Sequence, residues 1–241
     1  RAAECGLRSF QLMAGALDGL AVAPELLSHE GPFGVGYAVA VFPVTGRNES
    51  RRFVARYEQA EHDRLEGRRA AEDPWVRLAR LSLETYVRTG KRLFELPEGL
   101  PAGLTGRAAG TFVSLHVRGQ LRGCIGTTSP TTSSVALEIV QNAVSAGTAD
   151  PRFPPVGPGE LDRLEYSVDV LGPTEPIPGP EALDVRRYGV IVSHGGRRGL
   201  LLPNLDGVDT VEEQVRIARE KGGIGPHEPY TLERFEVVRH T

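Results

Sequence analysis

Hydrophobic and polar residues alternate in several short stretches of the chain, and this pattern predicts β-strands. Residues 111–117 alternate strictly, and residues 164–171 alternate again with Glu165 and Ser167 on one face. Further strands, the first two joined as a hairpin, are predicted at residues 188–193, 199–203 and 232–238.

Capping residues ahead of apolar positions at helical spacing mark the helix starts. Asp73 is a good N-cap, Pro74 suits the first helical position, and the helix is expected to end before Gly90. Two more helices are predicted, one from Ser133 or Ser134 to about Gly147 and one beginning at Thr210.

The first part of the chain has a different pattern. Residues 1–45 predict a helix, a loop at 28–34 and a strand at 35–42, which together are too little to bury a core. We therefore expect this piece to pack on another domain, inside or outside the chain. Residues 46–74 are rich in Arg, Glu and Ala and predict a linker helix with a solvated, charged surface. The main domain is predicted at residues 75–241.

Composition narrows the class of protein. The chain has 241 residues, of which 40% are hydrophobic and 24% charged, and its formal net charge is -3. This balance gives no reason to expect nucleic acid or an anionic membrane as a partner. No apolar run approaches the roughly 20 residues that span a bilayer. The chain starts at Arg1 in what resembles folded sequence, so we expect a fragment of a longer protein.

Cysteine and lysine are both scarce. Cys5 and Cys124 are isolated from each other and provide no disulfide framework, which favours a reducing compartment. Lys91 and Lys221 are the only lysines, and arginine supplies the other basic residues. Because no signal peptide is visible either, a cytoplasmic location is predicted.

Cys124 is the strongest chemical lead in the sequence. Residues 120–128 predict a turn that follows a strand and opens a helix, and Gly123 and Gly126 would allow positive φ or a close approach of another group. Arg122 places a permanent cation two residues from the thiol and would favour the thiolate. This arrangement predicts Cys124 and Arg122 as candidate catalytic residues.

The same stretch allows other interpretations. Backbone amides from Thr127 to Ser129 could point at an anion, as they do at helix N-termini. Cys124 could instead be a packed small hydrophobe with no chemical role, because cysteine is among the most buried residue types. The sequence alone does not decide between a reactive thiol and an inert one.

Four other residues are candidates for the same site. His116, Asp150 and Glu165 could supply acid–base chemistry, although no spacing assembles a catalytic triad. Asp150 and Arg152 are close enough to form a structural ion pair, or Arg152 could contact an anionic substrate. His116 could equally be a packed strand histidine. The histidines are scattered and no zinc motif is present, so no metal site is predicted.

Residues 75–241 resemble the AMMECR domain family. The matching motifs are residues 121–127, 150–153, 199–203 and 234–236. The resemblance implies an α+β domain of two lobes, with an antiparallel sheet flanked by helices and a cleft that Cys124 faces. Candidate cleft residues are then Gly123, Gly126, Thr127, His116, Asp150, Arg152 and Glu165.

The first fifth of the chain resembles a different family. Residues 14–19 and 30–37 are similar to the C-terminal end of a LigB-type domain, the class III extradiol dioxygenase fold that includes Memo proteins. Such dioxygenases bind iron through two histidines and a carboxylate, but the matching N-terminal histidines are absent here. His29 and Glu30 are adjacent, which is poor geometry for two ligands of one metal. Dioxygenase activity is therefore not expected, and no cofactor is predicted.

The two resemblances together imply the domain layout of protein A of the AmmeMemoRadiSam system. This layout implies a Memo-like protein and a radical SAM protein as partners, and no established reaction. Two functions remain open from the sequence. The chain is either an enzyme component that uses Cys124, or a non-catalytic binding or adaptor domain for a small molecule or for those partners. A lesser possibility is that the N-terminal piece only anchors the main domain.

Overall fold

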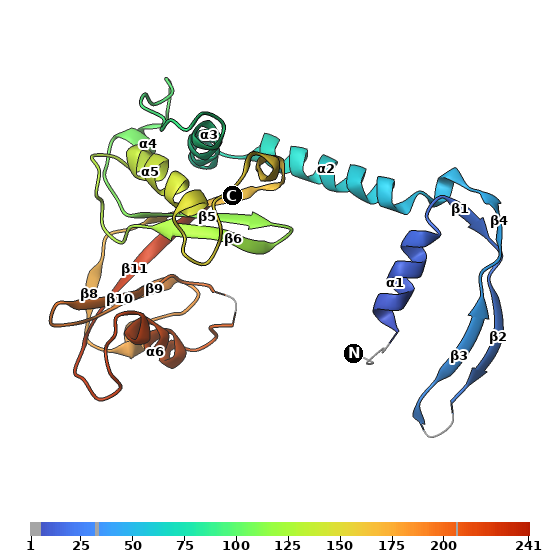
Figure 1. Ribbon diagram of the computed structural model, residues 1–241. Coiled ribbons are helices and arrows are strands. Elements are labelled where there is room, and N and C mark those ends of the chain that lie inside the picture. The colour runs from blue at the N-terminus through green and yellow to red at the C-terminus, as the bar shows by residue number, and fades with distance from the viewer. Residues whose placement is uncertain (1–5, 32–33, 206) are drawn as a thin grey trace. The chain divides into compact units, whose positions relative to one another are not determined.

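The structure is a computed structural model that describes residues 6–31, 34–205 and 207–241 (Figure 1). The chain folds as two compact units, which divide it between residues 67 and 68. Cys5 lies outside the described residues.

The first unit consists of one helix and two small sheets. Helix α1 is followed by strands that pair β1 with β4 and β2 with β3, both antiparallel. None of the described residues among the first 67 is buried. The elements are α1 (Leu7–Ala16), β1 (Leu20–Val22), β2 (Glu25–Glu30), β3 (Tyr37–Val41), β4 (Val44–Arg47) and the short 3-10 helix η2 (Glu49–Arg51).

The loop predicted at residues 28–34 is partly wrong. His29 lies in strand β2 opposite Ala38 of β3, because cross-strand pairing extends through this polar stretch. The helix predicted within residues 46–74 is confirmed as α2 (Phe53–Ala71). Its first amides are capped by Asp18, whose Oδ1 accepts from the amides of Phe53 at 2.7 Å and of the next residue at 3.2 Å.

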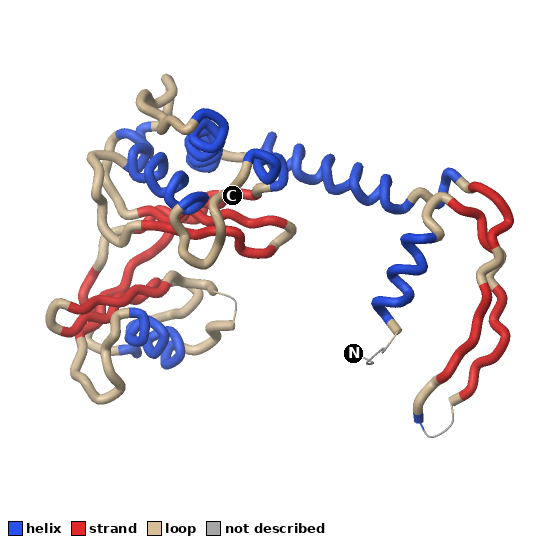
Figure 2. Tube along the Cα trace, viewed as in Figure 1, coloured by secondary structure: helices blue, strands red, loops and turns tan. Residues whose placement is uncertain are grey.

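The second unit is built on one seven-stranded antiparallel sheet (Figure 2). Its order is β10-β9-β11-β7-β5-β6, and β8 pairs with β11. The long strand β11 pairs with β9 through its first half and with β7 through its second, so it joins the two halves of the sheet. The strands are β5 (Thr111–Val117), β6 (Gln120–Gly126), β7 (Glu165–Leu171), β8 (Glu175–Ile177), β9 (Tyr188–His194), β10 (Arg197–Leu201) and β11 (Thr231–His240).

Helices pack separately on the two halves of this sheet (Figure 1). Helices α3 and α5 pack on the half formed by β5, β6 and β7, while α6 packs on β9 and β10. This arrangement confirms the α+β class. The helices of this unit are α3 (Pro74–Thr89), α4 (Ala102–Thr105), α5 (Val135–Thr148) and α6 (Val211–Lys221), with 3-10 turns η3 (Pro158–Arg163) and η4 (Pro180–Ala182).

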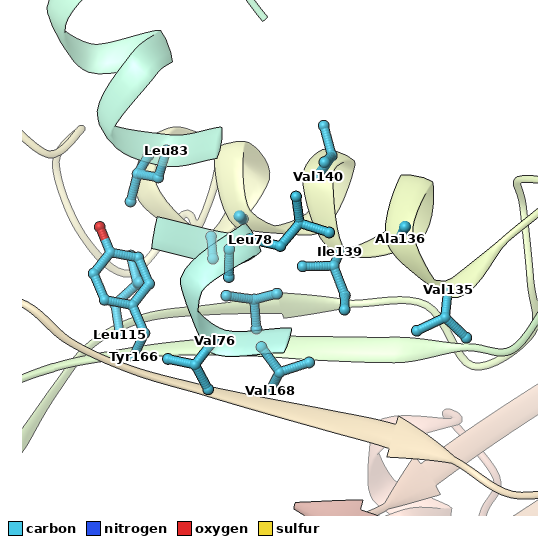
Figure 3. Packing of buried hydrophobic residues seen from close by; sticks show 14 of the residues in the cluster. Val76, Leu78, Leu83, Leu115, Val135, Ala136, Ile139, Val140, Tyr166 and Val168 are labelled. Atoms are coloured by element: carbon cyan, nitrogen blue, oxygen red, sulfur yellow. The ribbon is translucent and has the colours of Figure 1, made fainter. Parts of the chain in front are cut away.

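The larger core lies between α3, α5 and the sheet. Figure 3 shows side chains of both helices pointing toward those of β5 and β7, among them Leu78, Ile139, Leu115 and Val168. Each of these four is at most 2% exposed. Burial of this size stabilises the unit by about 1.5–3 kcal/mol for each large side chain.

The predicted helix caps are confirmed. Asp73 accepts from the amides of Trp75 at 3.0 Å and of the next residue at 3.1 Å, and Gly90 ends α3 in the left-handed conformation. Ser134 caps α5 and Thr210 caps α6 through their hydroxyls. Local hydrogen bonding therefore determines where these helices begin.

The predicted turn at residues 120–128 is wrong for most of its length. Residues 120–126 form β6, an edge strand, and the turn comes earlier at Arg118 and Gly119. Both of these residues have positive φ, of 52° and 74°, as a two-residue hairpin loop requires. Cys124 therefore lies within a strand, not at the mouth of a helix.

Candidate functional site

Strands β5, β6 and β7 present one polar face. Val113 and Leu115 point into the helix-covered core, so the residues that alternate with them face the other way. The register places Ser114 between Cys124 on β6 and Ser167 on β7. We call this surface the polar sheet face; it comprises Ser114, His116, Cys124, Glu165, Ser167 and Asp169.

Cys124 is held on both its backbone and its side chain. Its amide donates to Asp150 Oδ2 at 2.9 Å, so a side chain covers the open edge of β6 at this point. The Ser114 hydroxyl donates to Cys124 Sγ at 3.2 Å from the neighbouring strand. The thiol is half-buried.

The surroundings of Cys124 favour the protonated thiol. Burial raises the pKa of Cys124, while the Ser114 hydrogen bond and the Arg152 guanidinium lower it by less. Asp169 and Asp150 raise the pKa further. Burial therefore outweighs the neighbouring guanidinium, and these surroundings give no support to the expected thiolate.

Arg122 is committed to another partner. Its Nε and Nη2 donate to the two carboxylate oxygens of Glu160 at 2.7 and 3.0 Å, and Nη1 donates to the Pro154 carbonyl at 3.0 Å. The guanidinium lowers the pKa of Glu160. Arg122 thus ties β6 to residues 154–160, and Arg152 is the guanidinium that lowers the pKa of the thiol.

Asp150 and Arg152 form the ion pair that their spacing predicts. Arg152 Nε lies 3.0 Å from Asp150 Oδ1, and Nη2 lies 2.7 Å from Oδ2. These contacts and the Cys124 amide hold the pKa of Asp150 well below its usual range. A carboxylate stabilised in this way is a poor general base.

The pKa values of three cations are raised by electrostatic interaction with Cys124: Arg152, Arg239 and Lys221. Arg239 on β11 pairs with Asp169 at 2.7 and 3.0 Å. The Lys221 ammonium, at the end of α6, forms no ion pair or hydrogen bond with the described residues. Desolvation lowers the pKa of Lys221, and Arg152 lowers it further.

His116 and Glu165 lie opposite each other on β5 and β7. Burial lowers the pKa of His116, while Glu165 raises it and Arg239 lowers it. Glu165 is buried and paired with Arg68 of α2. Among the described residues, His116 makes no hydrogen bond to Cys124, so no thiol–imidazole pair is formed.

The Thr127 amide, predicted to point at an anion, donates to the Thr111 carbonyl at 2.9 Å, while the Thr127 hydroxyl binds a carboxylate of the chain. Glu138 of α5 is fully buried and accepts from the Thr127 hydroxyl at 2.6 Å. It also accepts from the amides of Thr131 at 3.0 Å and Thr132 at 2.9 Å. Burial alone would raise the pKa of Glu138, but these hydrogen bonds lower it. Thr127 therefore organises a loop.

Gly123 and Gly126 serve close packing. A Cβ on Gly123 would lie 2.2 Å from the carbonyl oxygen of Ala146 in α5. A Cβ on Gly126 would lie 2.4 Å from the carbonyl oxygen of Thr111. Neither glycine has positive φ. Of the two roles open from the sequence, close approach is the one observed.

The structure adds residues that the sequence did not single out for the site. Ser114 and Asp169 were missed because their partners lie on other strands. Arg239 was missed because it lies beyond the motif at residues 234–236 of the last strand. Lys221 had one available signal, since it is one of only two lysines. Among the described residues, no three His, Cys, Asp or Glu side chains are grouped to hold a metal ion. In this same part of the chain, no helix has the length and apolar character needed to cross a membrane.

Comparison with known proteins identifies a family model and several similar proteins. The AMMECR1 family model matches residues 76–240. A protein of Thermotoga maritima is 52% identical over 171 residues, which cover 70% of this chain and 98% of that protein. Protein CA_C1420 of Clostridium acetobutylicum is 46% identical over 239 residues, covering 99% of this chain and 50% of that protein. The chain thus spans half the length of the Clostridium relative.

One solved structure is also similar. The crystal structure of uncharacterized protein PH0010 from Pyrococcus horikoshii matches with a TM-score of 0.63 and 34% sequence identity. The match covers 68% of this chain and 88% of that chain.

Proposed function

The chain belongs to the AMMECR1 family, and from this premise we propose that residues 75–241 form a non-catalytic binding domain of an AmmeMemoRadiSam system. The domain holds a small molecule against the polar sheet face around Cys124. It works with a Memo-like protein and a radical SAM protein in the cytoplasm.

The pairing of the charged groups around Cys124 favours a binding function over a catalytic one. The groups that would activate Cys124 are already engaged: Arg122 with Glu160, and Asp150 with Arg152. The raised pKa leaves the thiol protonated near neutral pH. A nucleophile needs an adjacent base or a lowered pKa, and Cys124 has neither.

The layout of the first unit supports the system membership. Its described residues include exposed apolar side chains and no buried ones, as expected for a piece of a larger domain. We infer that this larger domain is of the LigB type, because residues 14–19 and 30–37 resemble the end of such a domain. Residues 32–33 lie outside the described part. The Clostridium relative has the length to contain it. We propose no dioxygenase activity for the present chain.

Co-purification tests this proposal. The tagged chain is co-expressed with the Memo-like and radical SAM proteins of the same genome, and a tagged unrelated protein serves as control. We expect both partners to be retained at near-stoichiometric levels by the chain only. Retention of neither partner would contradict membership in the system.

A second candidate, catalysis by the Cys124 thiolate, has one observation in its favour. The Ser114 hydroxyl and the Arg152 guanidinium both act to lower the pKa of Cys124. The pH dependence of iodoacetamide alkylation, measured in a Cys5→Ser background, decides between the candidates. Binding without catalysis predicts an apparent pKa above that of free cysteine in the same buffer. An apparent pKa below it would favour the enzyme.

A further inference from the structure

We propose that Arg68, Glu165 and His116 form a proton-linked latch. The last turn of α2 is attached to the sheet through Glu165, and protonation of His116 weakens that attachment. The latch requires no bound ligand and no partner protein, so it acts independently of the proposed function.

Glu165 is the residue that connects the helix to the polar sheet face. It begins β7, and the sheet register places it directly opposite His116 of β5. Residues opposite each other in neighbouring antiparallel strands have Cβ atoms about 4.5–5.5 Å apart. Glu165 Oε2 also accepts from Arg68 Nη1 in the last turn of α2. A buried carboxylate therefore has both an imidazole and a guanidinium as neighbours.

The other strands around His116 contribute one further charge. Burial lowers the pKa of His116, Glu165 raises it, and Arg239 of β11 lowers it. On β6, the apolar Leu121 lies opposite His116, and the titratable Cys124 lies two register positions away. Among the described residues, Glu165 is therefore the carboxylate that favours the charged imidazole.

The guanidinium and the protonated imidazole compete for this carboxylate. Arg68 partly neutralises Glu165, so His116 gains less from accepting a proton while the contact is formed. Conversely, a protonated His116 attracts Glu165 and repels Arg68, and linkage makes the two effects equal in free energy. The attachment of α2 is therefore strongest when His116 is neutral, and it weakens as the pH falls through the titration of His116.

The neighbouring Arg69 provides a matched control. It lies in the same turn of α2, but its Nη2 donates to Glu84 of α3 at 3.2 Å and not to Glu165. The Arg68 side chain is 66% exposed and that of Arg69 is 38% exposed, so both reach solvent. Arg68→Gln and Arg69→Gln thus each remove one positive charge from this turn without opening the core.

NMR titration of the histidines in the full chain tests the latch. The imidazole signals are followed from mildly alkaline to mildly acidic pH, and His116→Gln identifies the signal of His116. We expect His116 to titrate at a higher pH in Arg68→Gln than in the wild type, because Glu165 is no longer partly neutralised. In Arg69→Gln it should titrate as in the wild type. An unchanged titration in Arg68→Gln, or an equal shift in both variants, would overturn the proposal.

Hydrogen exchange measures the attachment of the helix end itself. Amide exchange in residues 64–71 is corrected for its intrinsic pH dependence and compared on the two sides of the measured His116 titration. The wild type should exchange roughly two- to fivefold faster on the acidic side, as expected for weakening of a partly exposed ion pair. His116→Gln should show no such change, since its side chain stays neutral. No change in the wild type, or the same change in both chains, would contradict the latch.

Discussion

At the scale of single residues, the chemistry of the site depends on which side chains pair with each other. Cys124 has a cation nearby, as its sequence neighbourhood suggests, but the cation is Arg152 and its effect is smaller than that of burial. Arg122 is two residues away in sequence and is directed to Glu160 instead. The protonation state of a thiol follows from its three-dimensional surroundings, because desolvation and charge act through space.

Asp150 provides a test at this scale. Its pKa is lowered, so its contribution to stability is fully present above the unfolded-state pKa and is lost as the pH falls toward the folded-state value. Asp150→Asn should reduce the free energy of unfolding by about 1–2 kcal/mol near pH 7, a modest figure because Arg152 is open to solvent. Urea denaturation should show this difference shrinking between about pH 5 and pH 2.

Asp162 offers the matched control for that measurement. It is exposed in η3, so Asp162→Asn removes a carboxylate without a buried contact. Its unfolding free energy should follow that of the wild type across the same pH range. If the stability difference between Asp150→Asn and the wild type stayed constant with pH, the lowered pKa of Asp150 would not contribute to the free energy of unfolding.

At the scale of elements, the site is set by how α5 approaches the edge strand β6. Gly123 is buried and leaves no room for a side chain against Ala146 of the helix. This contact, together with Arg122 and Asp150, holds β6 in place along its unpaired edge. An edge strand covered in this way cannot pair with another chain at that point.

Gly123→Ala tests this packing. The new Cβ would lie 2.2 Å from the Ala146 carbonyl oxygen, so backbone must shift, and we expect a loss of about 2–3 kcal/mol in the free energy of unfolding. Gly159→Ala is the control, since its Cβ would meet nothing within 4 Å. Chemical denaturation of both variants measures the effect. Equal stability of the two variants would show that α5 can move away at little cost.

At the scale of the whole molecule, the two units differ in what stabilises them. All the buried residues described in the chain lie in residues 68–241. The Thermotoga relative is matched over 98% of its length by 171 residues, so a protein of about this size exists in the family without the first unit. We therefore expect the second unit to fold as an independent domain.

Truncation tests this division. Residues 68–241 keep Arg68 and Arg69, which pair with Glu165 and Glu84. We expect this fragment to unfold cooperatively, with a Tm within a few degrees of that of the corresponding transition in the full chain. Calorimetry measures both. A fragment without a cooperative transition would show that the second unit depends on the first.

The fold was largely predictable from the sequence because its signals are local. Asp73 and Ser134 cap helices through amides two or three residues away, and the alternation at 111–117 reflects one buried face. The main failure was β6, where the glycines masked a strand. Gly123 and Gly126 are needed because they pack closely against α5 and Phe112. These contacts are between residues far apart in the sequence and cannot be predicted from the residues around each glycine.

Local sequence signals were therefore enough to predict the helix starts, most strands and the resemblance to the AMMECR family. The folded chain was needed to show that Arg122 binds Glu160 and that Arg239 binds Asp169. The physical reason is the distance along the sequence over which each interaction acts. Caps and alternation act over a few residues, whereas the partner of a charged side chain is set by elements that meet only when the sheet and its helices assemble.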